Sequence, residues 1–149
     1  MHPVRVLFIC DRNATRSQVA EALLRRLGGA SVEVYSAGVQ PEPFDLLAIE
    51  VMADMGIDIS GQMGKSMEHF MDQDFDYIIT LSNQCFDYAD DFPGEPEQLH
   101  WHLPDPVDFQ GDPQQRRWWL QQLYLELATR IRGWLAALPE DNLAIGESA

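Results

Sequence analysis

The sequence alternates between two kinds of apolar segment, and this alternation restricts the fold more than any other feature. Helical patterns of apolar residues occupy about 15–27, 41–55 and 113–138. Short runs rich in β-branched and aromatic residues, typical of buried strands, occur at Val4–Ile9, Val32–Ser36, Asp76–Leu81 and Leu99–Leu103. Strands that alternate with helices predict an α/β fold with a parallel sheet.

The length of 149 residues corresponds to one domain. We expect that domain over 1–138 and a flexible acidic tail over 139–149, where the apolar pattern stops. No apolar run approaches the roughly 18–20 residues of a membrane helix. Two cysteines exclude a disulfide framework, and the cytoplasm is the expected compartment.

The charge of the chain is strongly acidic and unevenly distributed. A net charge of −14 argues against nucleic acid or an anionic membrane as the main partner. Residues 1–26 nevertheless hold five arginines against two acidic residues, a local net charge of +3. This basic patch surrounds the loop between the first strand and the first helix.

That loop, Cys10–Ser17, begins where the first strand ends. Ligands of open parallel sheets bind at the carboxyl ends of the strands. In a strand-to-helix turn of this kind, backbone N–H groups point inward and form an anion-binding nest, which the helix dipole supports. Such sites lower the pKa of a cysteine to about 3.5–7.5, so we expect Cys10 to be a thiolate near neutral pH.

Three other side chains of the loop suit an oxyanion site. The planar guanidinium of Arg16 fits a tetrahedral oxyanion, and Ser17 can donate a hydrogen bond to the thiolate. Asn13 tolerates the left-handed backbone of a tight cradle. Taken alone, Cys10 could equally be a small buried hydrophobic residue. The position of the Cys-x5-Arg-Ser pattern at a strand-to-helix turn favours the functional interpretation.

The loop resembles the signature of the low-molecular-weight protein tyrosine phosphatases and of the arsenate reductases that share their fold. Gln18 resembles the reductase branch, because phosphatases usually have proline after the serine. The likeness extends along nearly the whole chain, through Ser36–Gly38, Gly56–Gln62, Asp76–Leu81 and Asp105-Pro106. It implies a single-domain three-layer sandwich, in which helices flank a four-stranded parallel sheet.

The resemblance also implies a role for each matching residue. Cys10 is the nucleophile, and Asp105 is the general acid that protonates the leaving oxygen. Arg16 and the backbone of 11–16 bind the oxyanion, while a hydrogen-bond network through Ser36 shapes the loop. The full oxyanion-binding and loop-shaping set is Asp11, Arg12, Asn13, Ala14, Thr15, Arg16, Ser17 and Ser36.

Two departures from the family pattern bear on the substrate and on the thiols. Phosphatases usually place an aromatic residue after Asp105-Pro106, where this chain has Val107 and Asp108, and this favours a small inorganic oxyanion. Asp108 also competes with Asp105 as the acid, since Asp before Pro is a common turn starter. Thioredoxin-coupled reductases carry a cysteine at the position of Ser82.

The nearest cysteine to that position is Cys85. Arsenate reduction needs a second sulfur to attack the Cys10–arsenic adduct. Cys85 is the candidate resolving thiol if its segment moves; alternatively it is a half-buried helix residue without a role. An external thiol reductant is expected for a reductase: thioredoxin, glutathione with glutaredoxin, or mycothiol.

Three functions remain open at this point. The first is a thiol-dependent arsenate reductase, and the second is a phosphatase that hydrolyses phosphomonoesters through a phosphocysteine. The third is a non-catalytic oxyanion-binding module. The expected partners are a small oxyanion and a thioredoxin- or glutaredoxin-type protein, and the chain is expected to be a monomer or weak dimer. No metal or organic cofactor is implied. His100 and His102 lack an obvious third ligand for a zinc site.

Overall fold

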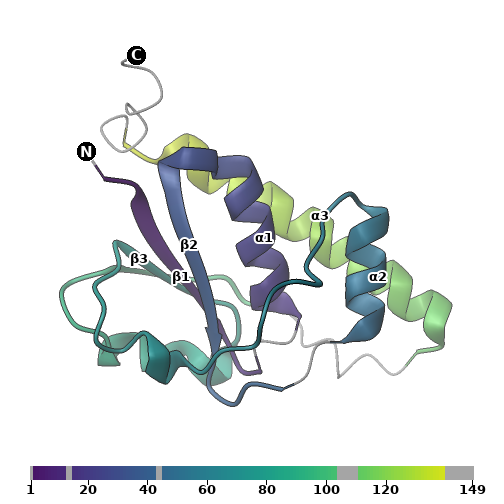
Figure 1. The fold of residues 1–149 in the computed structure, drawn as a ribbon, viewed down its shortest axis with the longest axis horizontal. Coiled ribbons are helices and arrows are strands. Elements are labelled where there is room, and N and C mark those ends of the chain that lie inside the picture. Colours follow the sequence, from purple (N-terminus) through teal and green to yellow (C-terminus); the bar gives the residue numbers. More distant parts are fainter. Residues whose placement is uncertain (1, 13–14, 43–44, 104–110, 140–149) are drawn as a thin grey trace.

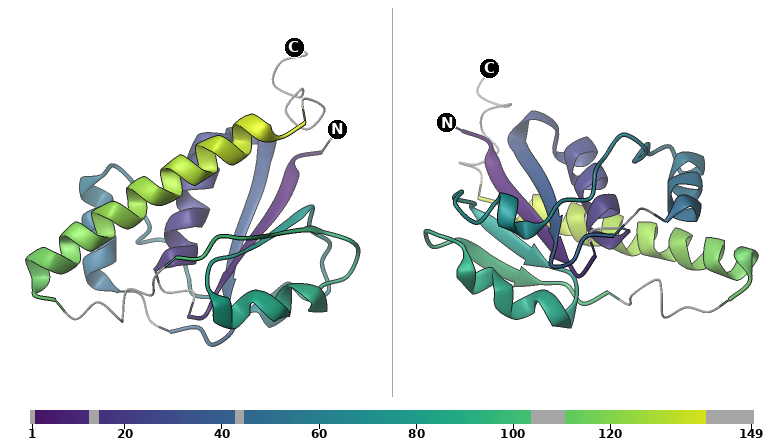
Figure 2. Two further views of the ribbon diagram at one scale, coloured as in Figure 1. Left: turned by 180° about the vertical axis from the view of Figure 1, so that it is seen from behind. Right: turned by 60° about the horizontal axis from the view of Figure 1, so that its bottom comes forward.

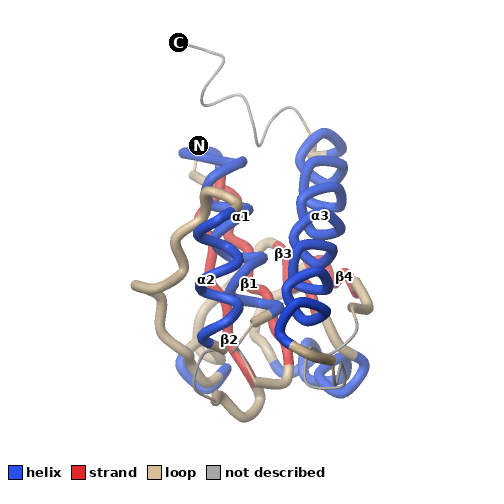
Figure 3. Tube along the Cα trace, turned by 90° about the vertical axis from the view of Figure 1, so that its right-hand side faces the viewer, coloured by secondary structure: helices blue, strands red, loops and turns tan. Residues whose placement is uncertain are grey.

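The computed structural model describes residues 2–12, 15–42, 45–103 and 111–139. Its centre is one sheet of four parallel strands in the order β2-β1-β3-β4 (Figures 1 and 3). The strands are β1 Val4–Cys10, β2 Val32–Gly38, β3 Tyr77–Thr80 and β4 Glu97–His100. The parallel α/β sheet predicted from the sequence is therefore confirmed.

Three α-helices pack together on one side of this sheet (Figures 1 and 3). They are α1 Arg16–Gly28, α2 Leu46–Asp54 and α3 Pro113–Ala137. The opposite face is covered by the two segments on either side of β3, which carry the 3-10 helices η2 Met67–His69 and η3 Asn83–Asp91 (Figure 2). A further short 3-10 helix, η1 Gly29–Ser31, joins α1 to β2.

Each face of the sheet carries its own apolar core. Val6 and Phe8 of β1 pack against the α-helices, whereas Leu7 and Ile9 pack toward η2 and η3. Successive side chains of a strand point to opposite faces. A central parallel strand is therefore apolar along its length, which explains the unbroken apolar run that predicted β1.

The register brings several chain segments to one edge of the sheet. Cys10 at the end of β1 lies beside Gly38 of β2, and Ile9 lies beside Thr80 of β3. The segments that leave these strands begin at the same carboxyl edge. The loop before α1, the segment after β2 and the segment after β3 are thus neighbours.

Two predicted boundaries differ from the structure. The fourth strand was expected at Leu99–Leu103 and lies at Glu97–His100, because its pairing with β3 begins at Glu97, a polar residue of an edge strand that leaves no apolar signal. The second helix begins at Leu46 rather than near Pro41, because the Asp45 side chain caps it by accepting from the Leu47 N–H at 3.0 Å.

The C-terminal helix agrees closely with its expected range of 113–138. Asp112 caps α3 in a capping box with Gln115, and Pro113 occupies its first turn. The acidic tail expected over 139–149 lies outside the described residues, apart from Pro139. In the part of the chain that is described, no helix has the length and hydrophobicity needed to cross a membrane.

Candidate functional site

The loop between β1 and α1 is held from outside by the segment that follows β2. The N–H groups of residues 39, 40 and 42 donate to the carbonyls of Cys10, Asp11 and Arg12 at 3.2, 2.8 and 2.9 Å, respectively. The side chain of Arg12 also pairs with Glu42 at 2.9 Å. Asn13 and Ala14, two of the predicted loop-shaping residues, lie outside the described residues.

Cys10 is buried at the end of β1, directly before the loop. Its sulfur lies 2.9 Å from the hydroxyl oxygen of Ser17, which is fully buried in the first turn of α1. A serine hydroxyl can donate to a thiolate, and hydrogen bonding to a charged form favours that form. Thr15, the residue before α1, is also buried, and its carbonyl accepts from the Val19 N–H.

Arg16 opens α1 and is only 4% exposed. Its Nη1 donates to the carbonyl oxygen of Leu103 at 3.0 Å, and its Nη2 lies 3.7 Å from a carboxylate oxygen of Asp11. Leu103 belongs to the segment that follows β4. The guanidinium therefore links the anion loop to the segment that follows β4.

Asp11 and Ser82 connect the loop to the segment after β3. The hydroxyl of Ser82 donates to the second carboxylate oxygen of Asp11 at 2.7 Å, and the same hydroxyl lies 3.1 Å from the sulfur of Cys85. The sulfur of Cys85 is also 3.2 Å from the carbonyl oxygen of Ile9. Because the Ser82 proton goes to Asp11, the thiol of Cys85 is the donor in its contacts with oxygen.

The environment of Cys85 favours the neutral thiol. Burial raises its pKa, the electrostatic interaction with Cys10 raises it further, and hydrogen bonds to Ser82 and Leu81 oppose the shift. The alternative interpretation of a half-buried helix residue is wrong in one respect, because Cys85 is fully buried within the 3-10 helix η3. Neither cysteine forms a disulfide bond in this structure.

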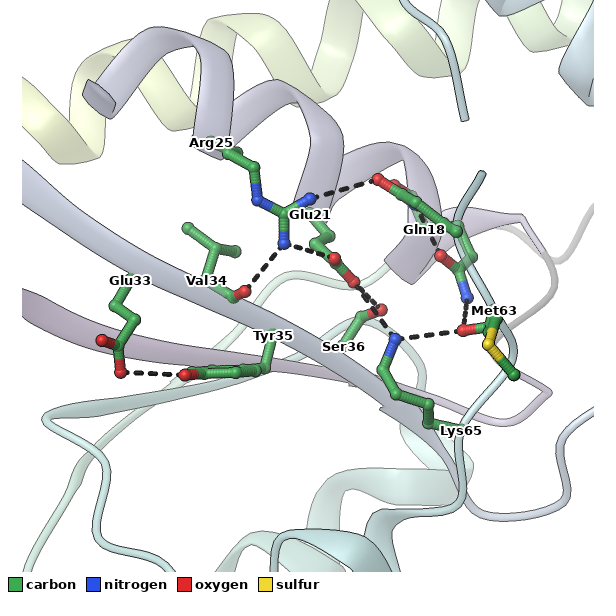
Figure 4. Close-up of polar contacts among 10 residues, drawn as sticks. Gln18, Glu21, Arg25, Glu33, Val34, Tyr35, Ser36, Met63 and Lys65 are labelled. Carbon is green, nitrogen blue, oxygen red and sulfur yellow. Dashed lines mark hydrogen bonds and ion pairs between the residues drawn. The ribbon is translucent and has the colours of Figure 1, made fainter. Parts of the chain in front are cut away.

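Ser36 contacts a buried carboxylate on α1. Its hydroxyl donates to Glu21, which also pairs with Arg25 and lies 3.8 Å from the ammonium of Lys65 (Figure 4). Lys65 donates in addition to the Met63 carbonyl at 3.0 Å. This cluster ties α1 to β2 and to the segment before η2, so it holds the helix that carries the loop.

A second set of contacts fixes the start of α1 against the same segment. The amide of Gln18 donates to the Met63 carbonyl at 3.0 Å (Figure 4), and Gln62 donates to the side-chain oxygen of Gln18 at 2.6 Å. Sequence reasoning used Gln18 only to separate family branches and missed Glu21 and Lys65 altogether. The available signal was Glu21 itself, a charged residue four positions after Ser17 and therefore on the same, buried side of α1.

An open hollow lies outside the loop. It has a volume of about 350 Å³ and is lined by Asp11, Arg12, Val39, Gln40 and Tyr88. Tyr88 belongs to η3 and is exposed. The hollow beside the anion loop is therefore lined by one acidic, one basic and one aromatic side chain.

The remaining residues that the sequence suggested for the site either make none of these contacts or lie outside the described residues. Asp105 and Asp108 fall within 104–110, which the structure does not describe. The Nδ1 atom of His100 lies 2.8 Å from the Thr80 hydroxyl, and its ring centre is 6.3 Å from that of His102. Within the described ranges, no group of three or more His, Cys, Asp or Glu residues is arranged to hold a metal ion.

Comparison with known proteins agrees with this arrangement. An arsenate reductase in the oxidized state is 30% identical, with a TM-score of 0.71, over 89% of this chain and 98% of that one. The thioredoxin-dependent arsenate reductase of Corynebacterium glutamicum is 33% identical, with a TM-score of 0.67, over 91% of this chain and 62% of that one. A glutaredoxin arsenate reductase from Synechocystis sp. is 34% identical over 102 residues, which are 68% of this chain and 78% of that protein.

The family model of the low molecular weight phosphotyrosine protein phosphatases matches residues 5–144. The match begins in β1 and extends beyond the end of α3. The resemblance first seen in the loop is thereby confirmed for nearly the whole chain. This chain belongs to the low molecular weight phosphotyrosine protein phosphatase family.

Proposed function

We propose that this chain is a thiol-dependent arsenate reductase. The observation that carries the proposal is the placement of Cys10, whose sulfur lies 2.9 Å from the Ser17 hydroxyl at the carboxyl edge of the sheet. The buried guanidinium of Arg16 opens the helix that follows. The arsenate reductases found among its relatives support arsenate as the substrate, as does Gln18 after Arg16-Ser17.

In the proposed first step, arsenate enters the loop with its charge facing the backbone N–H groups and Arg16. The Cys10 thiolate attacks arsenic and forms a sulfur–arsenic bond, while one arsenate oxygen leaves as water. Asp105 would protonate that oxygen, a role that rests on the sequence alone. The Ser17 hydroxyl stabilises the sulfur before the attack.

In the second step, another thiolate attacks the sulfur of Cys10. The electron pair of the sulfur–arsenic bond then stays on arsenic, which leaves as arsenite, and Cys10 remains in a disulfide. Two electrons have thereby moved from the two sulfur atoms to arsenic. A further thiol reductant must reduce the disulfide before the next turnover.

Cys85 is the internal candidate for this second thiol. Its sulfur lies 3.2 Å from the carbonyl oxygen of Ile9, the residue directly before Cys10, which supports their proximity. To react, Cys85 must lose its hydrogen bonds to Ile9 and Ser82 and become a thiolate. A local movement of η3 that follows adduct formation and exposes Cys85 to solvent would meet both requirements, because burial is the main cause of its raised pKa.

An external thiol is required whether or not Cys85 takes part. The names of the relatives give two donor systems, thioredoxin and glutaredoxin, and mycothiol is a third. We place the reaction in the cytoplasm, because thiol reductants are maintained there.

The test is an assay of arsenite production with arsenate and each thiol system, run in parallel with an aryl phosphate. Arsenite production that is lost in Cys10→Ser is the expected result. Fast hydrolysis of the aryl phosphate without arsenite would overturn the proposal in favour of a phosphatase. Binding of arsenate without turnover of either substrate would favour a non-catalytic module.

Two further variants assign the remaining roles. If Cys85 is the second thiol, a Cys10–Cys85 disulfide forms during turnover and can be trapped by omitting the external reductant. Cys85→Ser should abolish this disulfide and lower the rate of arsenite production. An unchanged rate would assign the second step to the external thiol. Asp105→Asn should lower the rate of the first step, with Asp108→Asn as its matched control. A larger loss in Asp108→Asn would move the acid to that residue.

A further inference from the structure

The anion loop contains a carboxylate that is held in a fixed position. Asp11 directly follows Cys10, and its side chain is only 16% exposed. One of its oxygens accepts from the Ser82 hydroxyl at 2.7 Å, and the other lies 3.7 Å from Arg16. A negative charge fixed at this place is unexpected in a loop that binds anions.

The contacts of Asp11 change the charge that an incoming anion meets. Arg16 is the cation at the start of α1, and Asp11 already offsets it. The positive charge of Arg12, next along the chain, is paired with Glu42 at 2.9 Å. Together with a Cys10 thiolate, the side chains of Asp11 and Arg16 give the site one net negative charge.

The backbone N–H groups and the helix dipole still attract an anion into such a site. Repulsion from Asp11 opposes that attraction in proportion to the charge of the anion. The repulsion therefore lowers the binding free energy of a doubly charged oxyanion by about twice as much as that of a singly charged one of the same shape. Because Ser82 and Arg16 hold the carboxylate in place, it cannot swing away without breaking both contacts.

We propose that Asp11 is a specificity-determining residue that makes the loop select singly charged over doubly charged tetrahedral oxyanions. The consequence is discrimination against sulfate, which remains doubly charged under all cellular conditions. Arsenate exists partly as a monoanion near neutral pH and escapes much of this penalty. The proposal uses the oxyanion site of the proposed function and does not depend on arsenate chemistry.

The test compares sulfate with perchlorate, two tetrahedral ions that differ in charge and do not titrate near neutral pH. Each ion protects Cys10 from alkylation by iodoacetamide, a neutral reagent, and peptide mass spectrometry reports the modification of Cys10 alone. Ionic strength is held constant with a bulky salt. The measured quantity is the ratio of sulfate affinity to perchlorate affinity within each protein.

The ratio should rise about tenfold in Asp11→Asn and in Asp11→Ala relative to the unmodified chain, a change of about 1.4 kcal/mol. Asp72→Asn is the matched control, because Asp72 is exposed and precedes β3, so it lies toward the opposite edge of the sheet. Its ratio should stay within about twofold, well below the change that one nearby charge produces.

Because the ratio is taken within one preparation, partial loss of folded protein does not change it. An unchanged ratio in the Asp11 variants would overturn the proposal, even if the affinities for both ions rose equally. Loss of binding of both ions would overturn it too, since Asp11 would then be needed to form the loop. None of these outcomes requires arsenite production, so failure of the proposed reductase activity is detected separately.

Discussion

The Ser17 hydroxyl lies 2.9 Å from the Cys10 sulfur, although the two residues belong to different secondary structure elements. The contact spans the whole anion loop and is buried on both sides. It exists because β1 ends and α1 begins at the same edge of the sheet. The sulfur that is proposed to attack the substrate is therefore positioned by the first turn of the following helix.

Replacing Ser17 by Ala should lower kcat/KM for arsenate by about ten- to hundredfold, because a hydrogen bond to a charged group contributes about 1.5–3 kcal/mol. The rate of Cys10 alkylation should fall in the same variant, since the thiolate loses its donor. Ser60→Ala is a suitable control, because Ser60 is exposed and bonds Asp58 instead. Equal activities of Ser17→Ala and Ser60→Ala would contradict the role of Ser17.

Replacing Glu21 by Ala should destabilise the protein. The carboxylate of Glu21 is buried and contacts Ser36, Arg25 and Lys65, so its removal takes the acceptor from the Ser36 hydroxyl and the opposite charge from Arg25 and Lys65. Breaking a buried pair typically costs about 3–5 kcal/mol, but the side chains of Arg25 and Lys65 are 52% and 28% exposed. We therefore expect a loss of about 1–3 kcal/mol, the range for a buried polar group that loses its partner. Urea unfolding measures the change.

The control for Glu21 is Glu68→Ala, because Glu68 is exposed on η2. It should change the free energy of unfolding by less than about 0.5 kcal/mol. If both variants were equally stable, the Glu21 cluster would not be what holds α1. Glu21→Gln should fall between them, since an amide retains the contact with Ser36 but not the charge.

The position of the site was predictable because its signals are local. Cys10 ends an apolar strand, and Arg16 and Ser17 begin a helix, so the strand-to-helix turn can be recognised within eight residues. The parallel register then decides which edge of the sheet carries the loop. These inferences need only hydrophobic periodicity and the rule that ligands bind at the carboxyl edge.

The contacts around the loop were not predictable in the same way. The pairing of Asp11 with Ser82 joins residues 71 positions apart, and its geometry depends on how the segment after β3 turns into η3. The 3-10 helix η3 buries Cys85 and Ala89 at a spacing of four residues, but most of its other residues are polar, so its composition does not separate it from a loop. The shift of the fourth strand has a related cause, because its first residues are polar and pair only through the backbone.

The pH dependence of stability should include a contribution from His100. Burial lowers its pKa below the usual 6.5, and the neighbouring His102 lowers it further. The unfolded chain therefore takes up the proton first as the pH falls. The stability that His100 contributes is complete above about pH 6.5 and is lost below that value.

In His100→Gln, the free energy of unfolding should vary less between about pH 7 and pH 5 than in the unmodified chain. The difference in slope cannot exceed about 1.4 kcal/mol per pH unit, the limit for one proton. Urea unfolding at several pH values measures it, with the exposed His69→Gln as the control. A steeper slope in His100→Gln would contradict the assigned direction of the pKa shift.

Cys85 should resist alkylation in the native protein while Cys10 reacts. The sulfur of Cys85 is fully buried, it contacts the Ile9 carbonyl at 3.2 Å, and burial raises its pKa. Buried cysteines of this kind are inert, so modification requires local opening of η3. Timed iodoacetamide labelling with peptide mass spectrometry should give a Cys85 rate at least about a hundredfold below that of the urea-unfolded chain, since local opening requires a few kcal/mol.

Equal labelling rates of Cys85 in the native and the unfolded protein would contradict this prediction, because they would show that η3 opens freely. The hydrogen bonds of Cys85 would then not keep it away from Cys10 before arsenate binds.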